Sequence, residues 1–351
     1  MLKTILSAYG FNESLATITA FGTGLINNTW KITAEGNHYI LQRINYAIFK
    51  RPEDIANNIG KVAAYLKEHY PGYQFVSPVK TTGGNELIHD PQQGYFRMFP
   101  FVKGSHTRDV VTTASEAYEA AKQFGRFTRL LTGIDLIELK ITIPDFHNLS
   151  LRYQQFLAAL ENGNRQRIAE SAQLINDVKY HASIVKEYEM IIANPAFRLR
   201  ITHHDTKISN VLFDETDKGI CVIDLDTIMP GHFISDVGDM MRTYLSPVNE
   251  DEKDFSKIKI REDFYTAIVA GYFNEMKDEL TETERSYFFY AGKFMIYMQA
   301  LRFITDHIND DVYYGAKYPG HNFVRAGNQM VLLKQLIGKE ALFSSVEEKP
   351  L

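Results

Sequence analysis

The sequence of 351 residues contains a single cysteine, Cys221. One cysteine excludes an intramolecular disulfide and any zinc or iron–sulfur site that needs several cysteines. This composition suits a reducing compartment, and we expect a cytoplasmic protein. The chain also lacks an uninterrupted run of about eighteen apolar residues, the length that a membrane-spanning helix requires. We therefore expect no membrane partner.

Basic residues are fewer than acidic ones. The chain has 38 Lys and Arg against 43 Asp and Glu, which gives a formal net charge of −5, and it has no long basic block. Because bulk electrostatics would not attract a polyanion, nucleic acid is not an expected partner. Hydrophobic residues make up 45% of the chain, and its length exceeds one typical domain of roughly 100–200 residues. A globular protein with two lobes is predicted.

The first hundred residues predict a small antiparallel sheet with one helix. A helix is expected to begin at Pro52, because proline and the following Glu53 and Asp54 suit a helix N-terminus. The predicted strands are rich in β-branched and aromatic residues and are bounded by Gly or Asn; they are 18–21, 29–33, 39–44, 87–89 and 95–99.

Beyond Gly104 the pattern becomes mainly helical, with a hairpin predicted from strands 210–214 and 219–225. We therefore expect an α+β protein with an N-lobe of residues 1–102 and a mainly helical C-lobe of residues 103–351. The predicted helices of the C-lobe are 113–131, 165–193, 262–277 and 282–309.

The segment 203–210 reads His-His-Asp-Thr-Lys-Ile-Ser-Asn and matches the spacing of the kinase catalytic loop H-R-D-x-x-x-x-N. Asp205 stands at the position of the base, Lys207 two residues beyond it, and Asn210 at the metal-binding position. Asp224 follows a predicted strand, in the place of the second metal-binding aspartate. Phosphoryl transfer needs a carboxylate to orient the attacking hydroxyl and oxygen ligands for Mg²⁺, and this segment supplies both.

Two other interpretations of the segment remain. Its polar residues could cap backbone groups in an ordinary loop. A zinc site on His203, His204 and Asp205 is disfavoured, because adjacent residues of an extended segment point in opposite directions.

A glycine-rich segment, 22–30, reads Gly-Thr-Gly-Leu-Ile-Asn-Asn-Thr-Trp between two predicted strands. Gly22, Gly24, Asn27 and Asn28 are expected to cover nucleotide phosphates, and a plain hairpin turn is the alternative. The P-loop pattern is absent, and the G-x-G precedes a strand instead of opening a helix, which disfavours a Rossmann site.

The phosphate-contacting lysine of protein kinases is missing from the next strand, which has Gln42 and Arg43 at its place. Neighbours in a strand alternate between faces, so only one of them can face the cleft, and the choice stays open. The following helix has Asn57 and Asn58 in its middle, so the usual Lys–Glu ion pair is expected to be absent.

The segment 96–104 is expected to form the hinge between the lobes. Phe99, Phe101 and Val102 would hold the adenine between apolar side chains and backbone groups. A surface strand and turn is the alternative interpretation.

Together these motifs resemble those of the aminoglycoside phosphotransferase and choline kinase superfamily, and the similarity is closest to the N-acetylhexosamine 1-kinases. The resemblance implies a two-lobed, protein-kinase-like fold that transfers the γ-phosphate of ATP, with Mg²⁺, to the hydroxyl of a small molecule. The segments that carry it, besides the N-terminal loop and the hinge, are 205–207, 223–231, 300–306, 311–314 and 320–322.

The closer resemblance implies phosphorylation of the anomeric C1 hydroxyl of GlcNAc or GalNAc. Asp226, Arg302 and Tyr314 would then be substrate-binding residues, although Arg302 could instead be a surface ion-pair partner and Tyr314 a core residue. A kinase for another alcohol, such as choline, homoserine or an aminoglycoside, is an alternative, and the acidic run 306–311 could serve a cationic acceptor. A non-catalytic nucleotide-binding scaffold is another.

Overall fold

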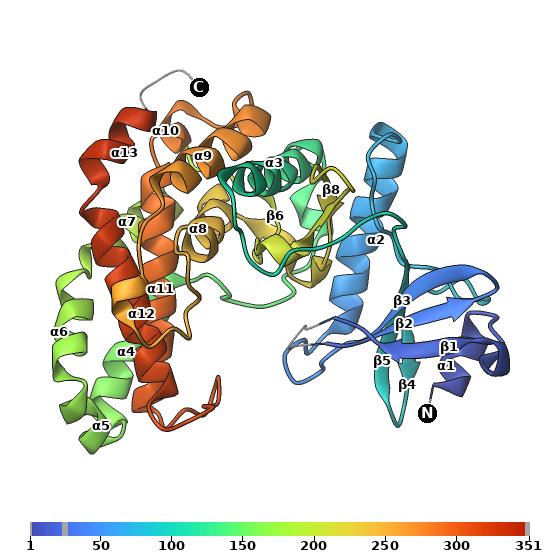
Figure 1. Cartoon of the computed structure of the whole chain (residues 1–351), viewed down its shortest axis with the longest axis horizontal. Helices are drawn as coiled ribbons and strands as arrows, with labels where there is room; N and C mark the ends of the chain where they lie inside the picture. The colour runs from blue at the N-terminus through green and yellow to red at the C-terminus, as the bar shows by residue number, and fades with distance from the viewer. Residues whose placement is uncertain (1, 23–26, 348–351) are drawn as a thin grey trace.

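The computed structural model describes residues 2–22 and 27–347. Figure 1 shows a small sheet formed by the N-terminal part of the chain, with α2 (Pro52–His69) between it and a larger body of helices. This is the two-lobed α+β arrangement that the sequence predicted. None of the described helices combines the length and the apolar character that crossing a bilayer requires.

The N-lobe sheet has five antiparallel strands in the order β1-β2-β3-β5-β4. All five lie where strands were predicted, and α2 begins at Pro52 as expected. A helix of six residues, α1 (Lys3–Ala8), was not predicted, because so short a segment shows no clear periodicity. The strands are β1 (Thr17–Ala20), β2 (Asn28–Ala34), β3 (Asn37–Arg43), β4 (Ile88–Asp90) and β5 (Gly94–Pro100).

The two faces of this sheet have different surroundings. Leu41 of β3 and its cross-strand partner Met98 of β5 are fully buried in a core that includes residues of α1. Successive side chains of a strand point to opposite faces. Gln42 and its cross-strand partner Arg97 therefore point to the other face, which is turned to the C-lobe.

The C-lobe is mainly helical, with two small sheets, β6 (Arg200–Thr202) with β9 (Met229–Gly231) and β7 (Val211–Phe213) with β8 (Gly219–Val222). The β7–β8 hairpin was predicted, whereas β6 and β9 have three residues each and show no alternation. The helices are α3 (Ala114–Leu130), α4 (Leu149–Asn162), α5 (Arg165–Glu170), α6 (Ala172–Tyr180), α7 (Ser183–Ala193), α8 (Phe233–Tyr244), α9 (Glu262–Met276), α10 (Glu282–Arg285), α11 (Phe288–Ile308), α12 (His321–Ile337) and α13 (Glu340–Glu347). Short 3-10 helices are η1 (Glu13–Leu15), η2 (Leu136–Glu138), η3 (Ile208–Asn210), η4 (Leu225–Thr227) and η5 (Phe255–Lys257).

Two of the predicted long helices are divided. The predicted helix 165–193 is three helices, α5, α6 and α7, with breaks at Ser171 and at 181–182. The predicted helix 282–309 is α10 followed by α11, with the break at 286–287. Apolar periodicity continues across such breaks because each piece buries one face, so the sequence pattern does not reveal the change of direction. The sequence analysis also missed α4, α8, α12 and α13.

The centre of the C-lobe is α11, which is buried on nearly all sides and packs against α8, α12 and α4. Gly238 permits α8 to approach α11 closely: a Cβ added there would lie 2.4 Å from the carbonyl oxygen of Ala291. The close contact sets the position of α8, which holds the loop described next.

Candidate active site

The loop that follows β6 is held by two aspartates of α8. Asp236 accepts hydrogen bonds from the backbone N–H groups of His203 and His204, at 2.9 and 2.8 Å. Asp239, one turn later, accepts from the backbone N–H of Thr206 at 2.9 Å. Residues three apart share one face of a helix. The loop backbone is therefore fixed on both sides of Asp205.

Asp205 lies at the centre of a polar group formed by the loop. The Asn210 Nδ2 donates to its carbonyl oxygen at 2.8 Å and to its carboxylate at 3.1 Å, and the Lys207 Nζ lies 3.2 Å from the same carboxylate oxygen. Burial would lower the pKa of Lys207, but the carboxylates of Asp205 and Asp239 raise it. The ammonium group therefore stays charged beside a carboxylate whose side chain is 23% exposed.

Asp224 follows β8 and adjoins this group, because the backbone N–H of Ile223 donates to the carbonyl of Asn210 at 2.8 Å. It has a left-handed backbone, with φ of 60°. Part of the side chain is exposed to solvent. The protein atoms packed around the carboxylate remove water from it and so disfavour its charged form. Together with the carboxylates of Asp226 and Asp205, they raise its pKa to about 7. The structure thus concentrates negative charge where the sequence predicted a metal.

The donor set at this place fits Mg²⁺. That ion is usually bound by one or two carboxylates together with water and substrate phosphates. Asn210 uses its Nδ2 for Asp205, so its Oδ1 is the atom that can face a cation beside the Asp224 carboxylate. In the described part of the chain, no cluster of three or more His, Cys, Asp or Glu side chains could hold a metal ion by itself.

Asp226 is buried in an ion pair that the sequence did not predict. Its carboxylate contacts the guanidinium of Arg97 from β5, and the side chains of both residues are less than 5% exposed. The other carboxylate oxygen accepts from the Asn27 Nδ2 at 2.8 Å. Asp226 therefore contacts the N-lobe and does not lie in the pocket that holds Arg302 and Tyr314.

The glycine-rich segment is described at its two ends. Gly22 has φ of 78°, a conformation that side chains rarely adopt. Gly24 lies outside the described residues. Asn27 connects the segment to Asp226, and its Oδ1 accepts from the backbone N–H of Asn45. Asn28 accepts from the Arg43 guanidinium at 2.7 Å, on the face of β3 opposite Gln42.

Of the two residues at the lysine position, Gln42 is the one that faces the C-lobe. It carries no charge, and its Oε1 accepts two hydrogen bonds from Arg97, at 3.1 and 2.9 Å. The helix residue Asn58 is also neutral and fully buried, and its Nδ2 donates to the carbonyls of Lys140 and Ile228 at 2.8 Å. Amide hydrogen bonds therefore connect α2 to the C-lobe.

The hinge segment leaves one backbone donor for a ligand. Pro100 has no N–H, and the N–H of Phe101 donates to the carbonyl of His38 at 3.0 Å. Within the described chain, the N–H of Val102 is the remaining donor between Phe99 and Lys103. Phe99 and Phe101 are half-buried on the strand and just after it.

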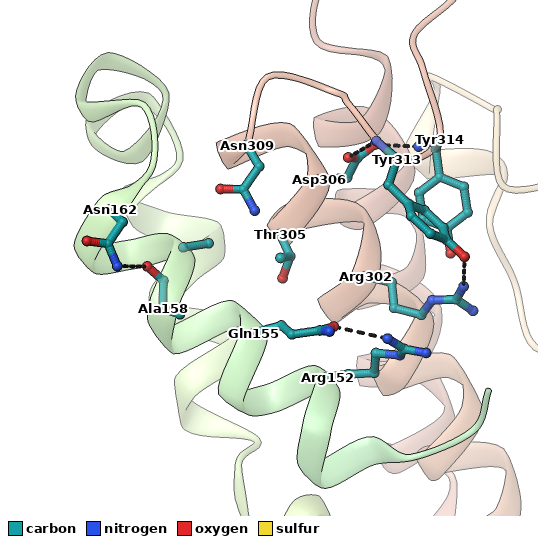
Figure 2. A pocket seen from close by; sticks show the side chains of 11 residues that line it. Arg152, Gln155, Ala158, Asn162, Arg302, Thr305, Asp306, Asn309, Tyr313 and Tyr314 are labelled. Carbon is teal, nitrogen blue, oxygen red and sulfur yellow. Dashed lines mark hydrogen bonds between the residues drawn. The ribbon is translucent and has the colours of Figure 1, made fainter. Parts of the chain in front are cut away.

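A cavity of about 490 Å³ lies between α4 and α11 and under the loop that follows α11. Figure 2 shows Arg152 of α4 and Arg302 of α11 next to each other, with Tyr313 and Tyr314 above Arg302. The structure thus brings the two predicted substrate residues, Arg302 and Tyr314, to one pocket. Its other lining residues are Gln155, Ala158, Ala159, Asn162, Thr305, Asp306 and Asn309.

Aromatic side chains connect this pocket with the catalytic loop. The Arg302 guanidinium lies 5.8 Å from the centre of the Phe146 ring. Phe146 stacks on His147, whose ring centre is 5.3 Å from that of His204. His204 directly precedes Asp205 in the chain, so only a short series of contacts separates pocket and carboxylate.

The acidic run 306–311, which begins in the last turn of α11, does not form a cage for a cation. Asp306 is buried, and its carboxylate accepts from the backbone N–H groups of Tyr313 and Tyr314, at 2.7 and 2.9 Å. Asp311 pairs with Arg167, and Asp310 accepts from Asn164. These carboxylates stabilise the loop. The charged side chains that line the pocket are Arg152, Arg302 and Asp306, and the Asp306 carboxylate is hydrogen-bonded to the loop backbone.

Sequence reasoning missed Arg97, Asp236, Asp239 and Arg152, and it did not predict the contacts of Asn58 with the C-lobe. The spacing of Asp236 and Asp239 in an apolar helix is a signal that could have been used, because two carboxylates on one buried face need partners. No pattern indicated Arg97, since its partners Gln42 and Asp226 are distant in sequence. Nor did any pattern indicate Arg152, which meets Arg302 in the pocket only through the packing of α4 on α11.

His204 should make the protein sensitive to acid. Burial lowers its pKa from 6.5 to about 4. In the unfolded chain His204 binds a proton near its ordinary pKa of 6.5, whereas in the folded protein it does so only near pH 4. The contribution of neutral His204 to the free energy of unfolding is therefore complete above pH 6.5 and is lost as the pH falls toward 4. The loss is about 3 kcal/mol for this group. Denaturant unfolding across this range should show a steeper fall for the wild type than for His204→Asn.

Asn suits the position because His204 has a left-handed backbone, with φ of 65°. The variant keeps a polar side chain there but removes the titration. Equal losses of stability in both proteins would show that folding does not lower the pKa of His204.

This chain is similar to one protein family and to several solved structures. The sequence profile described as Phosphotransferase enzyme family matches residues 17–280. An aminoglycoside phosphotransferase from Alicyclobacillus acidocaldarius has 13% identity and a TM-score of 0.64, with 97% of each chain covered. An amicoumacin kinase in complex with AMP-PNP, Ca²⁺ and Ami has 16% identity and a TM-score of 0.62, over 95% of this chain and 92% of that one.

A microcompartment-associated aminopropanol kinase has 17% identity and a TM-score of 0.62, over 97% of this chain and 98% of that one. At these identities the three structures share the fold of this chain. The sequence profile covers most of the chain, including the catalytic loop and Asp224. The protein belongs to the phosphotransferase enzyme family.

Proposed function

We propose that this protein uses ATP and Mg²⁺ to phosphorylate the anomeric C1 hydroxyl of an N-acetylhexosamine, GlcNAc or GalNAc. The observation that carries the kinase chemistry is the grouping of Asp205, Lys207 and Asn210 beside Asp224. The sugar acceptor is inferred from the resemblance at Arg302 and Tyr314, and the pocket that contains both residues supports it.

Asp205 acts as the base in this proposal. It orients the acceptor hydroxyl and takes its proton as the hydroxyl oxygen attacks phosphorus. The Asn210 Nδ2 fixes the carboxylate, and the Lys207 ammonium remains beside it to balance charge. Asn210 and Asp224 would hold Mg²⁺, which when bound neutralises charge on the phosphates.

The nucleotide is placed between the lobes, with residues 1–102 as its main binding lobe and residues 103–351 as the lobe of catalysis and acceptor binding. The hinge at 99–102 would hold the adenine through the Val102 N–H and the flanking Phe99 and Phe101. The segment 22–28 would cover the phosphates, and the hydrogen bond from Asn27 to Asp226 supports a place for Asn27 beside the cleft.

The charge at the pocket favours a neutral, oxygen-rich acceptor over a cation. Burial and the neighbouring Arg302 lower the pKa of Arg152, so two guanidinium groups share this space. They can donate to hydroxyl and acetamido oxygens, and they repel a quaternary ammonium or an amino sugar. Choline and aminoglycosides are therefore expected to be poor acceptors.

A panel of acceptors tests this proposal. GlcNAc and GalNAc should release ADP fastest, plain glucose and galactose less well, and choline least. The product should show phosphorus coupled to the anomeric proton by NMR and no reducing end. A 6-phosphate that still mutarotates would contradict the proposed position of transfer.

Arg302→Ala tests the pocket directly. It should raise KM for the sugar by about 10-fold or more, because a charged donor to a substrate oxygen is lost, with the KM for ATP unchanged. Arg165→Ala, on exposed α5, is the matched control. Equal sugar KM values for both variants would contradict the placement.

A carboxylate-bearing acceptor is the second candidate, since Arg152 and Arg302 could bind a carboxylate together. Homoserine represents this class in the panel. Fast phosphorylation of homoserine without phosphorylation of the sugars would contradict the sugar as acceptor. It would leave the pocket of Arg152 and Arg302 as the acceptor site.

A further inference from the structure

Strand β3 lacks the lysine that contacts phosphates in protein kinases, but the neighbouring strand β5 carries an arginine, Arg97, beside that position. Gln42 and Arg97 are direct cross-strand partners in the β3–β5 register, so their side chains stand side by side on the same face of the sheet. Gln42 holds the place where protein kinases have the phosphate-contacting lysine. Arg97 therefore places a positive charge beside Gln42, one strand away.

Arg97 is fixed in its position on two sides. Its Nε and one Nη donate to the Gln42 Oε1, and its other Nη pairs with Asp226. A buried charge is costly unless it is paired and hydrogen-bonded. Asp226 supplies that pairing from the C-lobe, two residues after Asp224 in the sequence.

The guanidinium retains donors for a further acceptor. It has five N–H donors, and the contacts with Gln42 and Asp226 use three of them, which leaves two on a side chain that is 3% exposed. Asp226, the ion-pair partner of Arg97, follows Asp224 by two residues in the sequence. This pairing brings Arg97 close to the place proposed for the metal and the phosphates.

We propose that Arg97 binds the phosphates of the nucleotide and supplies the charge that β3 lacks. Gln42 orients it through two hydrogen bonds, and Asp226 balances its charge before nucleotide binds. This inference rests on the proposed use of ATP. Arg97 of β5, oriented by Gln42 of β3, would contact the phosphates, as a single lysine of β3 does in protein kinases.

Binding of adenosine, ADP and MgATP to Arg97→Gln, measured by calorimetry, tests this assignment. ADP and MgATP should bind about 10- to 100-fold more weakly than to the wild type, because a charge-assisted contact is lost, whereas adenosine affinity should not change. Arg97→Lys should retain part of the affinity. Arg129→Gln, which removes a half-exposed ion pair with Glu275, is the matched control.

Moving the charge back to β3 gives a second test. In the double variant Gln42→Lys/Arg97→Gln, a lysine stands beside the position of Arg97, and ADP affinity should recover in part.

A purely structural role is examined with Arg97→Gln/Asp226→Asn, in which the buried carboxylate is no longer unpaired. That variant should regain thermal stability without regaining ADP affinity.

The inference is overturned if folded Arg97→Gln binds adenosine and MgATP with equal losses, or binds both as the wild type does. A wild-type protein that binds no ATP would remove both this inference and the proposed function. If Arg97→Gln loses only phosphate-dependent affinity but the wild type phosphorylates none of the acceptors, the role of Arg97 stands and the proposed function fails.

Discussion

Asp205→Asn should lower turnover by about 10²–10⁴-fold, the contribution of a positioned general base. Asparagine has the same shape as aspartate but cannot take the proton of the acceptor hydroxyl. The fold should be unaffected, because Asp236 and Asp239 hold the loop through its backbone. Steady-state ADP release and thermal unfolding of the same preparation measure the two effects.

The matched control for this variant is Asp278→Asn, an exposed carboxylate beyond the end of α9. It should keep wild-type turnover. Binding of AMP-PNP to Asp205→Asn should also be retained, since Asp205 faces the acceptor in the proposed mechanism. Near-normal turnover in folded Asp205→Asn would remove Asp205 from the role of base.

Asp224→Asn should remove most of the Mg²⁺-dependent activity, by about 10²-fold or more, because a metal ligand carries several kcal/mol of transition-state stabilisation. Asparagine tolerates the left-handed backbone at this position. The exchange also relieves repulsion between Asp224 and its neighbours Asp226 and Asp205. Stability without metal should therefore be equal to that of the wild type or higher.

Titration of turnover and of ATP binding with Mg²⁺ measures this effect. The wild type should lose activity in EDTA and regain it with Mg²⁺, whereas the variant should need far more Mg²⁺ or fail to respond. Asp278→Asn again serves as the control. A variant with the Mg²⁺ dependence of the wild type would exclude Asp224 as a ligand.

The sequence by itself determined the features that depend on short distances along the chain. The five N-lobe strands follow from local alternation and turn residues, and α2 begins at its proline. The catalytic-loop residues Asp205 and Asn210 are five positions apart and are hydrogen-bonded in the structure. Asp224 joins them through a hairpin that the sequence also predicted.

The tertiary structure alone decided the partners of charged residues that are far apart in sequence. Arg97 meets Asp226 because the β3–β5 register and the contact between the lobes bring them together. Arg152 and Arg302 face one pocket because α4 packs on α11, while Asp306 beside them is used by the backbone of its own loop. Composition indicates which charges are present, but only packing decides which of them are neutralised and which remain for a ligand.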